Sequence, residues 1–80
     1  MILKYIIIEN SETPIIFSRH HVSHLEVAES LGKVKSAGFC RISHNSSGTN
    51  VICYGSSSTL AIDSNPLDDE KIICKMFNEQ

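Results

Sequence analysis

The chain opens with a run of apolar residues that predicts a buried β-strand. Residues 2–9 are rich in isoleucine and include a tyrosine, a composition that favours extended structure. Both alternating sides of this segment are apolar, so we expect a strand that is central in its sheet or covered by a partner. Residues Asn10–Pro14 have turn composition, and Ile15–Phe17 is then predicted to be the return strand of a hairpin.

The stretch Ser36–Ile62 determines most of the predicted fold. Ser36–Ser43 and Asn50–Tyr54 are predicted to be paired strands around a polar turn. Gly55–Ser58 is predicted to be a bulge or a short loop, and Thr59–Ile62 a third strand of this group.

A turn at residues 45–48 sets the register of the central hairpin by placing His44 opposite Thr49. In that register Cys40 lies directly opposite Cys53, with Cβ atoms roughly 4.5–5.5 Å apart. The face that carries the cysteines is small and apolar, as expected beneath a helix, and consists of Gly38, Cys40, Ile42, Val51 and Cys53. The other face carries Phe39, Arg41, Ile52 and Tyr54.

A capping box predicts the first helix. In Ser23-His24-Leu25-Glu26 the serine hydroxyl can accept from the backbone N–H of Glu26, whose carboxylate can reach back to the N–H of Ser23. Gly32 is a typical stop signal, so the helix is expected to span about 24 to 31. Its inward side is predicted to consist of Leu25, Ala28 and Leu31.

A second helix is predicted at the C-terminal end of the sequence. Asn65 is its expected N-cap, Pro66 suits the first helical position, and Asp68 and Asp69 suit the positive end of the helix dipole. Its apolar stripe is predicted to be Leu67, Ile72, Ile73, Met76 and Phe77.

The resulting order along the chain is ββα-βββ-α, which predicts an α+β fold with a small antiparallel sheet packed against two short helices. All 80 residues are expected to form a single domain, 1–80. A chain of this size buries roughly 60% of its unfolded surface, so we expect modest stability unless the protein is crosslinked or oligomerises.

Composition narrows the function classes. The net charge of −2 gives no electrostatic support for nucleic-acid binding. The N-terminal apolar run lacks the basic flank and cleavage site of a signal peptide, and no stretch approaches the roughly 18 apolar residues of a membrane span. Three cysteines without an export signal indicate reduced thiols, so a cytoplasmic protein without membrane contact is expected.

Histidine and cysteine residues raise the alternative of a metal- or small-molecule-binding domain. Its candidate ligands are the histidine loop (His20, His21 and His24), His44, and the facing pair Cys40 and Cys53. Neither CxxC nor HxxxH spacing is present, and the competing interpretation is that both cysteines are small core residues and the histidines lie in loops. We therefore predict no bound metal or cofactor.

Catalytic patterns are weak, and an enzyme is not expected. The facing cysteines can oxidise in principle, but nothing in the sequence predicts a depressed thiolate pKa. The serines of Gly55–Ser58 lack a nucleophile-elbow pattern, and there is no phosphate-binding lysine. The acidic run at Asp68–Glu70 is explained by the helix dipole.

The face that carries Phe39, Arg41, Ile52 and Tyr54 is the candidate partner-binding surface. Its mixture of aromatic rings, an aliphatic side chain and an arginine is typical of protein interfaces. The competing interpretation is that a helix or further strands cover it, with Arg41 extending to solvent. We expect a protein partner, and a homo-oligomer in particular.

Three segments resemble a set of short uncharacterised proteins of phage and prophage genomes: SHLEVAESLG at 23–32, SAGFCRI at 36–42 and CYGSSSTLAIDSNPLDD at 53–69. Those relatives commonly carry an arginine before the proline and a glutamate after it, where this chain has Asn65 and Leu67. The resemblance implies a phage or prophage origin and a size class, and no activity. The sequence thus predicts a non-enzymatic protein-interaction or self-associating module of phage type.

Overall fold

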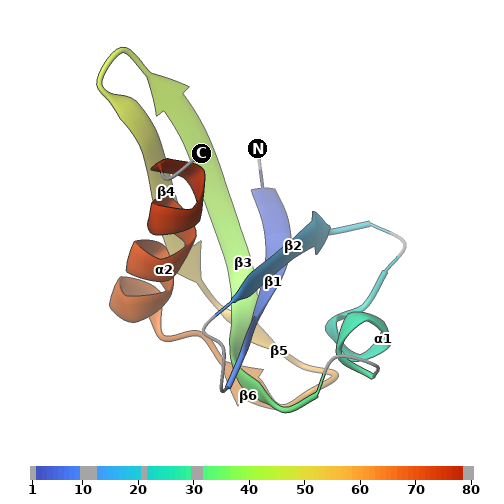
Figure 1. Cartoon of the computed structure of the whole chain (residues 1–80). Helices are drawn as coiled ribbons and strands as arrows, with labels where there is room; N and C mark the ends of the chain where they lie inside the picture. The colour runs from blue at the N-terminus through green and yellow to red at the C-terminus, as the bar shows by residue number, and fades with distance from the viewer. Residues whose placement is uncertain (1, 10–12, 21, 30–31, 79–80) are drawn as a thin grey trace.

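A four-stranded antiparallel sheet forms the centre of the computed structural model, which describes residues 2–9, 13–20, 22–29 and 32–78 (Figure 1). Its strands lie in the order β2-β1-β3-β4. They span Pro14–Ser18 (β2), Ile2–Ile8 (β1), Val34–Asn45 (β3) and Gly48–Tyr54 (β4). A two-stranded sheet of β5 (Ser56–Ser57) and β6 (Ile62–Asp63), helix α1 (His24–Ala28) and helix α2 (Pro66–Asn78) complete the predicted α+β fold.

Strand β1 is central, as its two apolar sides predicted. It pairs with β2 as a hairpin on one side and with β3 on the other. Tyr5, Ile6 and Ile7 are fully buried because elements cover both faces of the sheet.

The hairpin of β3 and β4 has the predicted register. Cys40 pairs with Cys53 and His44 with Thr49, and Asn45 and Gly48 form the last pair before a turn at residues 46–47. In Figure 1 the tip of this hairpin extends past the start of β1, whose register with β3 begins at Ile2 and Arg41.

Two apolar clusters lie on opposite faces of the four-stranded sheet. Helix α2 packs Ile73 against the face that carries both cysteines, in a cluster of Tyr5, Ile7, Cys40, Ile42, Val51, Cys53 and Ile73. On the other face, Ile6, Ala28 and Ala37 form a second cluster, joined by partly buried residues of β2 and of the segment that includes β6.

The expected strand Thr59–Ile62 is wrong. Residues 58–61 form the turn between β5 and β6, and Ala61 has a positive φ of 55°. The segment Gly55–Ser58, expected to be a bulge or loop, contributes β5 instead. Two-residue strands are too short to produce a hydrophobic period. The hydrophobic pattern therefore predicted a strand where the turn lies.

The helices begin where their caps predicted, but two of their expected inward positions are wrong. Ser23 and Glu26 form the capping box of α1. Leu25 of α1 is 43% exposed and Leu67 of α2 is 74% exposed, whereas His24 is buried. Ala28 is buried as expected, and Leu31 lies outside the described residues. Neither helix has the length and apolar character that crossing a membrane requires.

Candidate functional site

The four residues predicted to share a face do so, and β1 extends their arrangement into two rows across the sheet. Ile2, Arg41 and Ile52 are aligned on β1, β3 and β4. In the next row Lys4, Phe39 and Tyr54 are aligned in the same way. We call this set of residues the Arg41 face: Ile2, Lys4, Phe39, Arg41, Ile52 and Tyr54.

Exposed apolar side chains lie beside the cation on the Arg41 face. Ile52 is 54% exposed and Tyr54 is 41% exposed, and Arg41 is exposed as well. The rings of Phe39 and Tyr54 stack with centroids 5.8 Å apart and an interplanar angle of 22°. This stack packs one side of the tyrosine ring against Phe39 and leaves Tyr54 partly accessible to solvent.

Polar residues border the Arg41 face at one end and α1 borders it at the other. Ser43 pairs with Asn50 in the row toward the hairpin tip, and both are exposed. At the opposite end, the rings of His24 and Phe39 form a T-shaped pair with centroids 5.9 Å apart. The Nζ of Lys4 donates to the carbonyl of Val22 at 2.8 Å, so its ammonium is held near α1. Arg41 therefore supplies the charge at the middle of the surface.

The sequence did not predict that Ile2 and Lys4 belong to the Arg41 face, because nothing local to residues 2–9 indicates which strand lies beside them. Their place beside Arg41 and Phe39 depends on the pairing of β1 with β3, across more than thirty positions of chain. The sequence of β1 did contain one signal: a lysine inside an apolar run indicates that the side of the strand that carries it has access to solvent.

A buried carboxylate lies on the opposite side of the sheet. Asp69 is completely buried and accepts hydrogen bonds from the Tyr5 hydroxyl at 2.5 Å, the Ser36 hydroxyl at 2.7 Å and the backbone N–H of Asn65 at 2.8 Å. Burial, and then the hydrogen bond to Asp69, raise the pKa of the Tyr5 hydroxyl above its ordinary value. These contacts tie α2 to β1 and β3, so the structure gives this aspartate a packing role beyond the predicted dipole interaction.

Those histidines and cysteines of the metal alternative that the structure describes do not come together. Nε2 of His24 lies 2.8 Å from the carbonyl oxygen of Gly38, which can only accept, so this nitrogen is the donor. Its ring contacts Phe17 and Phe39 on the face opposite the cysteine pair. His20 is exposed beside Arg19, and His21 lies outside the described residues. Within the described segments, no group of three histidine, cysteine, aspartate or glutamate residues is placed to hold a metal ion.

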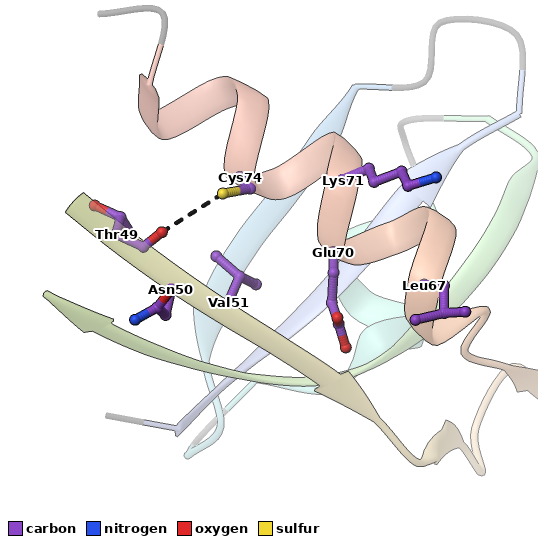
Figure 2. A pocket seen from close by; sticks show the side chains of 7 residues that line it. All are labelled: Thr49, Asn50, Val51, Leu67, Glu70, Lys71 and Cys74. Atoms are coloured by element: carbon purple, nitrogen blue, oxygen red, sulfur yellow. Dashed lines mark hydrogen bonds between the residues drawn. The ribbon is translucent and has the colours of Figure 1, made fainter. Parts of the chain in front are cut away.

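A shallow groove of about 290 Å³ lies between the outer edge of β4 and helix α2 (Figure 2). Glu70 reaches from α2 to the edge of β4 and accepts from the N–H of Cys53 at 2.9 Å. One turn later, the thiol of Cys74 donates to the carbonyl of Thr49 at 3.5 Å. Exposed Leu67 and Lys71 complete the α2 side of the groove. The contacts from Glu70 and Cys74 cover part of an otherwise open sheet edge.

Of the serines considered as nucleophiles, Ser57 is used within the small β5–β6 hairpin. Ser57 is buried, and its hydroxyl accepts from the N–H of Leu60 at 3.2 Å and lies 3.3 Å from the hydroxyl of Thr59. The hydroxyl of Ser64 donates to the carbonyl of Gly55 at 2.7 Å. These three contacts stabilise the hairpin at its turn and at the end where β5 begins and β6 ends.

Comparison with known proteins adds no assignment to this geometry. No protein-family model matches the chain, and no curated protein or solved structure matches it significantly.

Proposed function

We propose that this chain is a non-enzymatic protein-interaction module, of phage or prophage type and cytoplasmic, that forms a homo-oligomer through the Arg41 face. The observation that carries the proposal is the pair of aligned rows in which Ile52 and Tyr54 are exposed beside Arg41. Interfaces are enriched in aromatic residues and arginine at their centre and carry a polar rim, which Ser43 and Asn50 provide here.

A second copy of the chain is a suitable partner for this surface, because Arg41 and Tyr54 of one copy can meet Tyr54 and Arg41 of the other across a two-fold axis. The surface offers an accessible aromatic ring, Tyr54, and a cation, Arg41, on neighbouring strands. In an isologous dimer, the guanidinium of each copy can lie over the ring of the other. Burial of apolar surface in a dimer would also add stability to an 80-residue chain, whose own core is small.

Light scattering coupled to size exclusion, over a range of concentrations, tests the proposal. The native chain is expected to show a mass above that of a monomer. Arg41→Glu and Tyr54→Ala are expected to raise the dissociation constant by about tenfold or more, as substitutions at the centre of an interface do. The matched control is Lys71→Glu, a charge reversal on exposed α2 that should leave the mass unchanged.

A monomeric native chain at every concentration would overturn self-association. If that monomer captured another protein and lost it in both Arg41→Glu and Tyr54→Ala, the face would be a docking surface for that protein instead. Equal masses for the native chain and both variants, together with unchanged capture, would eliminate the Arg41 face as a functional surface.

A further inference from the structure

The cysteines at positions 40 and 53 are paired across the central hairpin in the closer of the two antiparallel geometries. The N–H of Cys53 donates to Glu70 on α2, so it points away from β3. Backbone groups alternate in direction along a strand, and Cys40 and Cys53 therefore form a pair without mutual backbone hydrogen bonds. Such pairs have Cα atoms about 4.5 Å apart, within the range that a disulfide spans.

The cysteine pair is shielded from solvent on the face of the sheet that α2 covers. Cys40 is fully buried and Cys53 is 3% exposed, within the cluster beneath α2. Burial raises the pKa of the Cys40 thiol to about 11, and burial together with the nearby Cys40 raises that of Cys53 to about 12. The thiols are therefore slow to react while the sheet is closed. Because α2 packs over both cysteines and β4 is the edge strand, local separation of these elements from the rest of the sheet is needed to expose the thiols.

We propose that Cys40 and Cys53 are a redox modification site that closes to a cross-strand disulfide in the presence of a low-molecular-weight disulfide such as oxidised glutathione. One cysteine loses its proton and attacks a sulfur of oxidised glutathione, which releases one glutathione thiolate. The second cysteine then displaces the other glutathione from the mixed disulfide. The pair loses two electrons and two protons, and these leave with the two molecules of reduced glutathione.

The new bond would close a loop across the hairpin turn and restrict the unfolded chain, so oxidation is expected to stabilise the fold. The inference does not depend on the Arg41 face, because the cysteines lie on the opposite side of the sheet. Cys74 is separate from the pair: it is only partly buried, and its thiol contacts the carbonyl of Thr49.

The test uses a Cys74→Ser chain, which retains only the proposed pair, equilibrated with oxidised glutathione in native buffer. We expect both remaining thiols to become protected from alkylation after denaturation, peptide mapping to recover residues 40 and 53 crosslinked, and the thermal midpoint to rise by roughly 5–15 °C. Dithiothreitol should reverse all three changes. The unmodified chain is mapped in parallel, so the result does not depend on how the variant folds.

The control is Cys53→Val in the same background, which keeps a small apolar side chain and should show no rise in thermal midpoint. Thiols that remain fully alkylated after prolonged equilibration would overturn the proposal. A stable single glutathione adduct without a crosslink would also overturn it, since the pair would then be unable to close.

Discussion

The hydroxyl of Tyr5 donates a hydrogen bond to the carboxylate of Asp69, 64 positions later in the chain. The same carboxylate accepts from Ser36, so one buried side chain joins β1, β3 and α2. A buried acceptor of this kind stabilises a fold only while all its donors remain satisfied, because each unpaired buried donor carries a desolvation cost.

Replacing Asp69 is therefore expected to lower the free energy of unfolding far more than replacing its neighbour Asp68. Asp69→Ala should lower the free energy of unfolding by about 3 kcal/mol or more, since it leaves the hydroxyls of Tyr5 and Ser36 and a backbone N–H without their acceptor. Asp68→Ala, which removes an exposed contact with Asn65, should cost less than about 1 kcal/mol. Urea unfolding of both variants measures the difference, and equal midpoints would contradict the packing role of Asp69.

Stability is expected to fall under mildly acidic conditions through His24. Burial lowers the pKa of this imidazole below its ordinary value of 6.5, so the unfolded chain takes up a proton at a pH where the folded chain does not. The stability contributed by the neutral His24 is complete above pH 6.5 and is lost as the pH falls toward and through the lowered pKa of the folded chain. Thermal unfolding from about pH 8 to about pH 5 should show this loss, and His24→Gln, which keeps a donor for Gly38 without titrating, should show a shallower slope. Identical slopes would rule His24 out as the source.

The carboxylate of Glu70 is expected to protect the edge of β4. Glu70→Ala removes the acceptor of the Cys53 N–H, so exchange of that amide hydrogen should accelerate by about tenfold or more. Glu70→Gln retains an acceptor oxygen and should stay close to the native rate. Hydrogen exchange followed by NMR provides the measurement. If both variants exchanged alike, the contact would have no protective role.

Two apolar residues of α2 should respond very differently to truncation. Ile73 is fully buried against the cysteine face, and Ile73→Ala should cost about 2–5 kcal/mol through lost burial and the cavity left behind. Leu67 is 74% exposed, and Leu67→Ala should change the unfolding free energy by less than about 0.5 kcal/mol. Denaturant titrations of the pair check this, and comparable losses would mean that Leu67 is covered in solution.

Local signals in the sequence were sufficient for the four strands of the large sheet and for the starts of the helices. The turn around Ser46 and Ser47 set the pairing of Cys40 with Cys53, because strand register follows from the turn and from alternation. The capping box likewise located the start of α1 at His24. A cap does not specify which side of a short helix faces the sheet, and the structure buries the ring of His24 there instead of Leu25.

Distant pairings explain what the sequence did not predict. The burial of Asp69 depends on Tyr5 and Ser36, which no local period connects with α2. The same is true of Ile2 and Lys4 on the Arg41 face. In each case the missing information was the position of β1 between β2 and β3, which arises only when the whole sheet assembles.

That position of β1 also has a consequence for how the chain is made. Strand β1 is synthesised before β3, which pairs along it, and before α2, whose Asp69 accepts a hydrogen bond from Tyr5. An isoleucine-rich segment with two apolar sides must therefore remain unenclosed until β3 and α2 have been synthesised, and incompletely folded chains are prone to aggregate. Enclosure of β1 therefore has to wait for elements that follow it in the chain.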